Sequence, residues 1–376
     1  MVIFDRIIIG SSPIAVMLAV KFSRAGLSTV IIEAETEIGG AWKIKYIPEV
    51  GFTETACHLI EFYGNAYDVI SDLIGIQFKE PEVQPIKILE NGKQFPYTSR
   101  KSIVFEFIQL LLFYCTVFLI RAFNACVPSS LKFKKGERFS LFSLREKVWF
   151  SFRYRLLNLF NFNGIKEPVG GYVTFLQKLK DSIEENDIGL VSEKVISIRG
   201  NHLSGQKILL SSGRELLTKK TYITESVSIL NENISRPKFA TSKEYWHVLA
   251  SMLKSQASVI RPYIHFPQNK YIHRITASSH KSLIKEDHLR IYFLIQLRKH
   301  PNDIPYLKLK IEEALKFCKA AHENPNVILH EVFIEEFIGD SKNSQYSYGE
   351  DIGGLHIIKT VGDLAKAVIV NSELRE

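Results

Sequence analysis

The first 33 residues contain a strand–helix–strand pattern that restricts the fold of this chain more than any other feature. Residues 6–10 (RIIIG) predict a buried strand, residues 13–25 predict a helix that Gly26 closes, and residues 29–33 predict a second strand. About thirty residues is the length that a βαβ unit requires. Because such a unit joins parallel strands, the pattern predicts an α/β fold built on a parallel sheet.

The turn between this strand and helix has the chemistry of a dinucleotide-binding loop. Gly10 permits the tight turn, and small residues at Ser12 and Ala15 let the backbone approach a pyrophosphate and the helix pack on the strand. The helix N-terminus adds free N–H groups and partial positive charge for phosphates. Glu33, about twenty positions on, can accept hydrogen bonds from ribose hydroxyls. The candidate binding residues in this unit are Gly10, Ser11, Ser12, Pro13, Ile14 and Glu33.

Two positions of this turn depart from the usual pattern, in which Ser12 and Ala15 would both be glycine. Each side chain adds only a few atoms, so the turn survives, but close approach at position 12 is less free. A βα turn that binds nothing is the alternative interpretation of this segment taken by itself.

A glycine pair follows the second predicted strand. Gly39 and Gly40 let the backbone fold against a dinucleotide, and Trp42 can wall its pocket. The run VIIEAETEIGGAW resembles the second strand and GG motif of the flavin-dependent amine oxidase superfamily, which includes amine oxidases, protoporphyrinogen oxidases, phytoene desaturases and UDP-galactopyranose mutases. The resemblance implies FAD as the cofactor. It adds as cofactor-binding residues Ala34, Gly39, Gly40, Ala41 and Trp42.

Weaker matches follow in the order expected for that superfamily. Residues 51–58 (GFTETACH) are similar to a segment that passes near the flavin, which makes His58 a candidate to face the flavin ring. A hydrogen-bonded histidine on a partly buried helix is the alternative. The resemblance also implies that Val195 flanks the adenine, and that Gly353 and Gly354 open the last helix at the isoalloxazine.

Residues 268–279 (QNKYIHRITASS) resemble a segment of mutase-like members that contacts substrate or flavin. Arg274 would suit an anionic group there, because its planar fork binds phosphate or carboxylate with two hydrogen bonds. A surface arginine is the alternative, and His273 would point the other way if the segment is a strand. His58 and Arg274 are therefore the candidate catalytic residues. No metal site is expected, since the four cysteines lack metal-like spacing.

The segment 103–160 suggests how a substrate could arrive. A long apolar helix is predicted over 103–127, but its uncharged run, between Glu106 and Arg121, is shorter than the roughly 20 residues of a membrane span. Aromatic and basic residues then interleave, which fits docking on anionic lipid headgroups. A helical cap with an internal apolar face is the alternative. No nucleic-acid recognition module accompanies the pattern, so we expect no nucleic-acid partner.

Hydrophobic residues make up 46% of the chain, which excludes global disorder. We expect an α/β protein with an FAD-binding Rossmann-type (GR2-like) domain and an inserted α+β substrate domain. The first would use residues 1–60, 165–230 and 335–376, and the second 61–164 and 231–334. The start of the chain lacks a signal-peptide pattern, so the expected location is cytoplasmic, with peripheral contact to the inner face of a membrane.

The expected function is an FAD-dependent oxidoreductase acting on a small molecule that is lipid- or sugar-linked. One alternative is a mutase-like flavin isomerase that acts on a sugar nucleotide. The other is a non-catalytic descendant that keeps the fold as a membrane- or partner-binding module.

Overall fold

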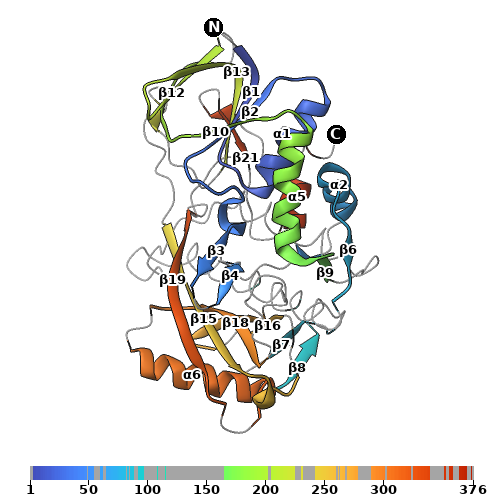
Figure 1. The fold of residues 1–376 in the computed structure, drawn as a ribbon, viewed down its shortest axis with the longest axis vertical. Helices are drawn as coiled ribbons and strands as arrows, with labels where there is room; N and C mark the ends of the chain where they lie inside the picture. The colour runs from blue at the N-terminus through green and yellow to red at the C-terminus, as the bar shows by residue number, and fades with distance from the viewer. Residues whose placement is uncertain are drawn as a thin grey trace, which may run out of the picture.

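The structure of the chain is a computed structural model. Figure 1 shows two large sheets, one toward each end of the molecule, with helix α6 (Ile304–Phe317) at the end far from the N-terminus. The structure describes residues 3–48, 50–54, 60–61, 65–81, 83, 85–88, 92–96, 108, 115, 165–201, 205–224, 230–231, 242–259, 261, 263–266, 269–277, 289–300, 303–322, 325–338, 351–352, 355–358, 364–370 and 374.

The first sheet has a parallel centre. Each strand there is paired in parallel with its neighbour, and the order is β10 (Gly189–Ser192), β2 (Thr29–Glu33), β1 (Ile3–Ile9), β13 (Glu215–Thr224) and β21 (Leu355–Ile358). The apolar runs in β1 and β2 are typical of strands that are buried on both faces. Helix α1 (Pro13–Arg24) connects β1 to β2, so the βαβ unit is confirmed.

An antiparallel meander extends this sheet. Strand β11 (Val195–Asn201) pairs with β12 (Gly205–Leu210), and β12 pairs with the first half of β13, whose second half pairs with β21. The meander packs on one face of the sheet, where Ile7 and Ile9 belong to the same core. Two short strands complete the sheet, β14 (Leu230–Asn231) and β20 (Asp351–Ile352).

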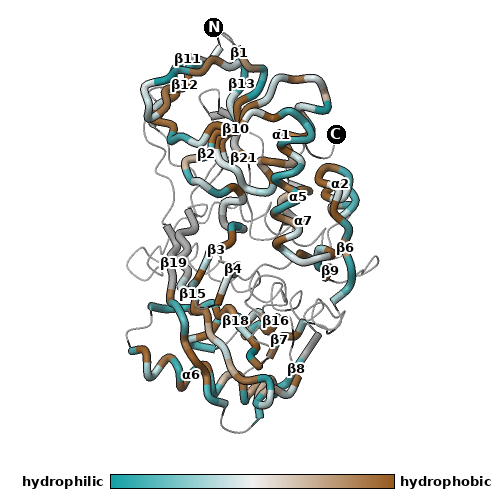
Figure 2. Tube along the Cα trace, in the orientation of Figure 1, coloured by the Kyte–Doolittle hydropathy of each residue, from teal (hydrophilic) through white to brown (hydrophobic). Residues whose placement is uncertain are grey.

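Helices cover the opposite face, where Ile8 and Ile31 point. They are α1, α2 (Ala66–Ile74), α5 (Gly171–Glu185) and α7 (Leu364–Val370), and Figure 2 labels all four beside the sheet. Residues 13–20 of α1 are all buried, as expected for a helix that is apolar on every side. The hydropathy colouring of Figure 2 shows the apolar stretches of α1 and α5.

The second sheet is mostly antiparallel and carries α6 on one face. Its order is β19 (Ile328–Ile338), β15 (Ser242–Leu253), β18 (Arg290–Leu297), β17 (Ile272–Ala277), β16 (Tyr263–His265), β7 (Ile86–Ile88) and β8 (Gln94–Pro96). Asp303 caps α6 by accepting a hydrogen bond of 3.1 Å from the Tyr306 amide. Ile311 and Leu315 of α6 are buried in the core between the helix and the sheet.

Two small sheets complete the fold. One joins β5 (Ile60–Glu61), β9 (Ile165–Pro168) and β6 (Phe78–Lys79). The other is the hairpin of β3 (Ile44–Ile47) and β4 (Gly51–Glu54), which directly follows the glycine pair. Ile47 and Val50 of this hairpin pack against Leu249 and Tyr292 on the face of the second sheet that α6 does not cover. The hairpin thus links the first βαβ unit to the second sheet.

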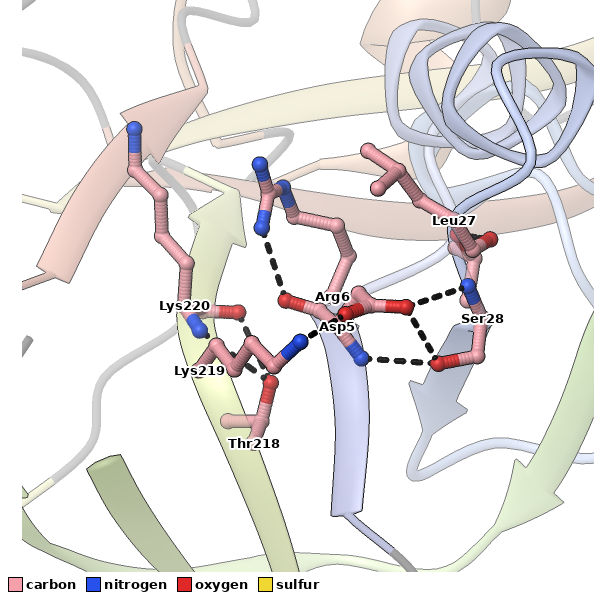
Figure 3. Close-up of polar contacts among 8 residues, drawn as sticks. Asp5, Arg6, Leu27, Ser28, Thr218, Lys219 and Lys220 are labelled. Carbon is pink, nitrogen blue, oxygen red and sulfur yellow. Dashed lines mark hydrogen bonds and ion pairs between the residues drawn. The ribbon is translucent and has the colours of Figure 1, made fainter.

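A polar cluster joins the first half of β1, the start of β2 and the middle of β13 (Figure 3). Asp5 accepts hydrogen bonds of 2.9 and 2.8 Å from the amide and hydroxyl of Ser28, and one of 2.6 Å from Lys219. The Ser28 hydroxyl in turn accepts a bond of 2.8 Å from the amide of Asp5. These hydrogen bonds link β1 to β13 and to the residue that precedes β2.

Several predicted elements are confirmed, and one is wrong. Residues 86–97 have Asn91-Gly92 between apolar stretches, which predicts a hairpin, and this hairpin is present as β7 and β8. The helix expected over 355–370 is wrong, because 355–358 form strand β21 and the helix begins at Leu364. Gly353 and Gly354 therefore precede a strand and do not open the last helix, although both lie outside the described residues. The apolar run LHII pairs with β13, and this tertiary pairing overrides its helical pattern.

Other expectations depend on residues that the structure does not describe. The helix expected over 103–127 and the basic–aromatic segment after it lie outside the described residues, apart from positions 108 and 115. In the part of the chain that the structure describes, no helix is long and apolar enough to cross a membrane. The division into domains stays a prediction.

Candidate dinucleotide-binding site

The turn after β1 has the backbone geometry that the sequence predicts. Gly10 has φ 92°, in the region that favours glycine, and its amide donates a hydrogen bond of 2.8 Å to the carbonyl of Ile32. This bond ties the turn to the end of β2. The carboxyl ends of the parallel strands β1 and β2 therefore meet here, where open α/β sheets bind ligands.

Glu33 lies at the end of β2 with its carboxylate against the turn. Its Oε2 accepts hydrogen bonds from the amide (2.9 Å) and the hydroxyl (2.6 Å) of Ser11, and its Oε1 accepts one of 3.0 Å from the amide of Glu35. A carboxylate has about four acceptor sites, so capacity remains for a further donor. The Glu33 carboxylate is thus fixed beside the turn, as a ribose-binding acid would have to be.

Helix α1 begins at the other side of the turn. Ser12 is its N-cap, with Oγ at 3.4 Å from the amide of Ala15, and Pro13 occupies the first helical position. The amide of Ile14 belongs to the first turn, which has no partner within a helix. Ala15 is fully buried in the core between α1 and the sheet, so its methyl group is accommodated.

The glycine pair folds back onto this turn. The Gly39 amide lies 3.0 Å from the carbonyl oxygen and 3.1 Å from Oγ of Ser11. Gly39 and Gly40 have φ of 113° and 56°, and a Cβ added to Gly40 would lie 3.4 Å from Cα of Ser12. An added carbon would thus be in ordinary contact with the turn, and the positive φ of both residues is what favours glycine here. The GG segment therefore packs against the loop, as the sequence predicts.

The other expected cofactor residues are spread over several environments. Trp42 packs on α5, with ring centroids 5.5 Å from Tyr172 and 5.4 Å from Phe175. Ala34 is exposed directly after β2, and Val195 is buried at the start of β11. The side chain of Ala41 and the whole of His58 lie outside the described residues. Their roles stay predictions.

No protein-family model matches the sequence, and no curated protein does either. Solved structures match over almost the whole chain. Putrescine oxidase bound to putrescine is 13% identical, with a TM-score of 0.61 over 100% of this chain and 98% of that chain. An oxidoreductase from Methanosarcina mazei is 13% identical, with a TM-score of 0.64 over 99% and 100%. Reduced UDP-galactopyranose mutase is 12% identical, with a TM-score of 0.55 over 90% and 82%.

This chain has the fold of the flavin-dependent amine oxidase superfamily. At these identities the likeness is one of fold. It confirms the resemblance that the GG motif indicates, and it extends that resemblance from the first 45 or so residues to both sheets.

In this amine oxidase fold, Arg274 lies on β17 of the second sheet. It is partly buried and donates hydrogen bonds to Oε1 of Gln296 and, at 3.3 Å, to the hydroxyl of Tyr263. Its guanidinium carbon also lies 5.9 Å from the centre of the Tyr263 ring. Arg274 is therefore held by neighbours from β16 and β18, and it is not an extended surface arginine.

The expectation that His273 points away from Arg274 is wrong. Ile272 and Ile275 both reach the core under α6, which residues three apart in a regular strand cannot do. A bulge at His273 explains this, because the pairing with β18 shifts between Ile272 and Arg274. The His273 ring consequently lies 4.9 Å from the ring of His265, the cross-strand partner of Arg274.

Sequence reasoning missed this histidine pair. Burial, followed by neighbouring positive charges, lowers the pKa of His265 to about 3 and that of His273 to about 4, so both rings are neutral at pH 7. No spacing in the sequence reveals the pair, since it depends on the register of β16 and β17 and on the bulge.

Proposed function

We propose that the chain is an FAD-binding flavoprotein whose adenine dinucleotide lies against the Gly10 turn. The contact between Glu33 and Ser11 carries this proposal, because it places an acid at the end of β2 within hydrogen-bond distance of a loop that opens a helix. The pyrophosphate would lie at the N-terminus of α1, where the amide of Ile14 and the helix dipole favour negative charge. Glu33 would hold the ribose hydroxyls.

The two departures from the glycine pattern are compatible with this cofactor. Ala15 is buried without leaving the helix, so the close packing that a glycine would provide is retained. The Ser12 hydroxyl turns back to the amide of Ala15, along its own helix. Ser12 therefore occupies the Ala15 amide, one of the backbone N–H groups at the helix N-terminus, and fewer of these groups remain for a phosphate.

We propose that the chemistry is that of an FAD-dependent oxidoreductase. FAD would accept a hydride from a carbon of a C–N, C–C or C–O bond of a small molecule, and loss of a proton from the bonded atom would leave a double bond. The protein's own part is to bind and orient that molecule. The second sheet is the proposed site for it, because its uncovered face contacts the hairpin that directly follows the GG segment.

The mutase-like isomerase stays the second candidate, favoured by the position of Arg274. A partly buried arginine held by Gln296 and Tyr263 is suited to an anion such as the diphosphate of a sugar nucleotide. An isomerase would use reduced flavin without net redox change. It therefore predicts binding of a sugar nucleotide without consumption of an electron acceptor.

The first experiment is the visible spectrum of the purified protein, before and after incubation with FAD and removal of the excess. Bound flavin absorbance supports both enzymatic functions. A colourless protein that takes up no FAD contradicts them and leaves a membrane- or partner-binding protein. Anaerobic reduction of the flavin by candidate substrates, compared with binding of sugar nucleotides, then separates oxidoreductase from isomerase.

A further inference from the structure

One register row of the second sheet is polar across five neighbouring strands. Lys87 on β7 pairs with His265 on β16, His265 with Arg274 on β17, Arg274 with Gln296 on β18, and Gln296 with His247 on β15. Directly paired residues lie on the same face of a sheet. We call these five residues the polar row.

The polar row lies on the face that α6 does not cover. Its neighbours along the strands, such as Ile264, Ile295 and Val248, belong to the core under α6, and side chains alternate between faces. Gln296 and His247 are buried, 3% and 0% exposed, and the other three residues of the row are half-buried. Buried polar side chains cost stability unless they are hydrogen-bonded, and Gln296 accepts such a bond from Arg274.

The same face points toward the nucleotide-binding unit. Leu249, two residues after His247, contacts Ile47 of the β3–β4 hairpin, and Glu331 of β19 forms an ion pair with Lys45 of that hairpin. Figure 1 shows β3 and β4 between the second sheet and the elements of the first βαβ unit. A group bound on the polar row would thus lie on the cofactor side of the sheet.

Positive charge gathers around the row. Burial and then nearby positive charges lower the pKa of both His265 and His273. The groups among these that are charged at pH 7 are Lys87, Arg274 and Arg298. Arg298 follows β18 and donates a hydrogen bond of 2.8 Å to the carbonyl of Phe266. Phe266 is the residue after His265, so this bond brings the charge of Arg298 near the row.

We propose that the polar row binds an oxyanion, a carboxylate or phosphate group carried by the substrate, with Arg274 as its main ligand. The hydrogen bonds to Gln296 and Tyr263 orient the guanidinium, so less side-chain freedom is lost on binding. Lys87 and Arg298 add long-range attraction. His265 and His273 are neutral, so they can donate hydrogen bonds to the anion without repelling the neighbouring cations. As a statement about substrate, this inference rests on the proposed function, whereas the anion site itself can be tested separately.

The test is calorimetric titration of FAD-saturated protein with inorganic phosphate and with succinate, at constant ionic strength. Saturating the protein with FAD keeps the probes from the Gly10 turn. We expect saturable binding that Arg274→Gln weakens roughly 10-fold or more, the scale of one lost charged hydrogen bond. Lys87→Met should weaken it less. The matched control is Lys308→Met, which removes a cation from α6 on the other side of the same sheet and should leave the affinity unchanged.

The preferred probe identifies phosphate or carboxylate as the recognised group. Absence of saturable binding, wild-type affinity in Arg274→Gln, or an equal loss in Lys308→Met would overturn the proposal. If Arg274→Gln does not fold, as judged by its thermal melt, the contrast between Lys87→Met and Lys308→Met decides. If the protein takes up no FAD, the proposed function fails, but the same contrast in the flavin-free chain still tests the polar row.

Discussion

The hydroxyl of Ser11 donates a hydrogen bond of 2.6 Å to Oε2 of Glu33 and lies 3.1 Å from the amide of Gly39, from which it accepts. Ser11 is 1% exposed, so a single buried hydroxyl joins the turn, the acid at the end of β2 and the GG segment. These are the three parts that a dinucleotide would have to contact together. Their mutual geometry is thus fixed by contacts within the protein itself.

Replacement of Glu33 tests the ribose contact. Glu33→Ala should weaken FAD binding by about 1–3 kcal/mol, the scale of hydrogen bonds to a charged acceptor. The measurement is titration of flavin-free protein with FAD. Glu35→Ala is the matched control, since Glu35 is exposed and its carboxylate pairs with Lys43 at 2.7 Å. Unchanged affinity in Glu33→Ala would refute the role of this residue.

Replacement of Ser11 tests whether its hydroxyl acts through Glu33. Ser11→Ala should weaken FAD binding by about 0.5–1.5 kcal/mol, the value of an ordinary hydrogen bond. If Ser11 only positions the acid, Ser11→Ala combined with Glu33→Ala should bind FAD no more weakly than Glu33→Ala alone. Additive losses in this double-mutant cycle would instead show that Ser11 acts independently.

Gly39 tests the close packing of the GG segment. Gly39→Ala places a Cβ in a backbone with φ 113° and 2.9 Å from Cδ2 of Leu176, so both strain and a contact oppose it. Gly213→Ala is the matched control, with φ 85° and open space around the added carbon. Backbone strain alone costs about 1–2 kcal/mol. In denaturant unfolding, Gly39→Ala should therefore lose more stability than Gly213→Ala, and equal losses would argue against tight packing at this position.

The sequence was most informative where a pattern is local. Strand β2 has the predicted ends, Thr29 and Glu33, because an apolar run between a turn and an acid admits few other structures. The Gly10 turn and the GG segment were also predictable, since each requires backbone conformations that glycine favours.

Long-range pairing was not predictable in the same way. Residues 355–358 have an apolar pattern that fits a helix as well as a strand, and only the partner strand β13 decides between them. No local pattern shows that the twelve residues of β15 (Ser242–Leu253) form one strand, or that His247 lies in register with Gln296. The polar row exists only through the register of five strands, of which β15, β16, β17 and β18 lie between residues 242 and 297 and β7 lies at residues 86–88.

Asp5 gives a prediction for pH dependence. Hydrogen bonds from Lys219 and Ser28 hold the pKa of Asp5 well below its ordinary value of 3.8. Because the folded pKa is depressed, ionised Asp5 stabilises the fold above the ordinary pKa, and this contribution is lost as the pH falls below it. Asp5→Asn should lower the melting temperature at neutral pH and flatten its decline between about pH 5 and pH 2. Asp72→Asn, at an acid whose side chain is 79% exposed, should leave the profile of the wild type.

Ser12 offers a change that should improve the proposed cofactor site. Ser12→Gly restores the usual glycine and releases the amide of Ala15, which Oγ of Ser12 now approaches to 3.4 Å. Glycine at an N-cap costs only a few tenths of a kcal/mol relative to serine, so α1 should remain intact. We therefore expect tighter FAD binding with nearly unchanged thermal stability. Ser12→Leu is the opposing variant, because a bulky side chain would fill the space next to Gly40 and should prevent FAD uptake. If FAD binds Ser12→Leu as tightly as it binds the wild type, the dinucleotide does not rest on this turn.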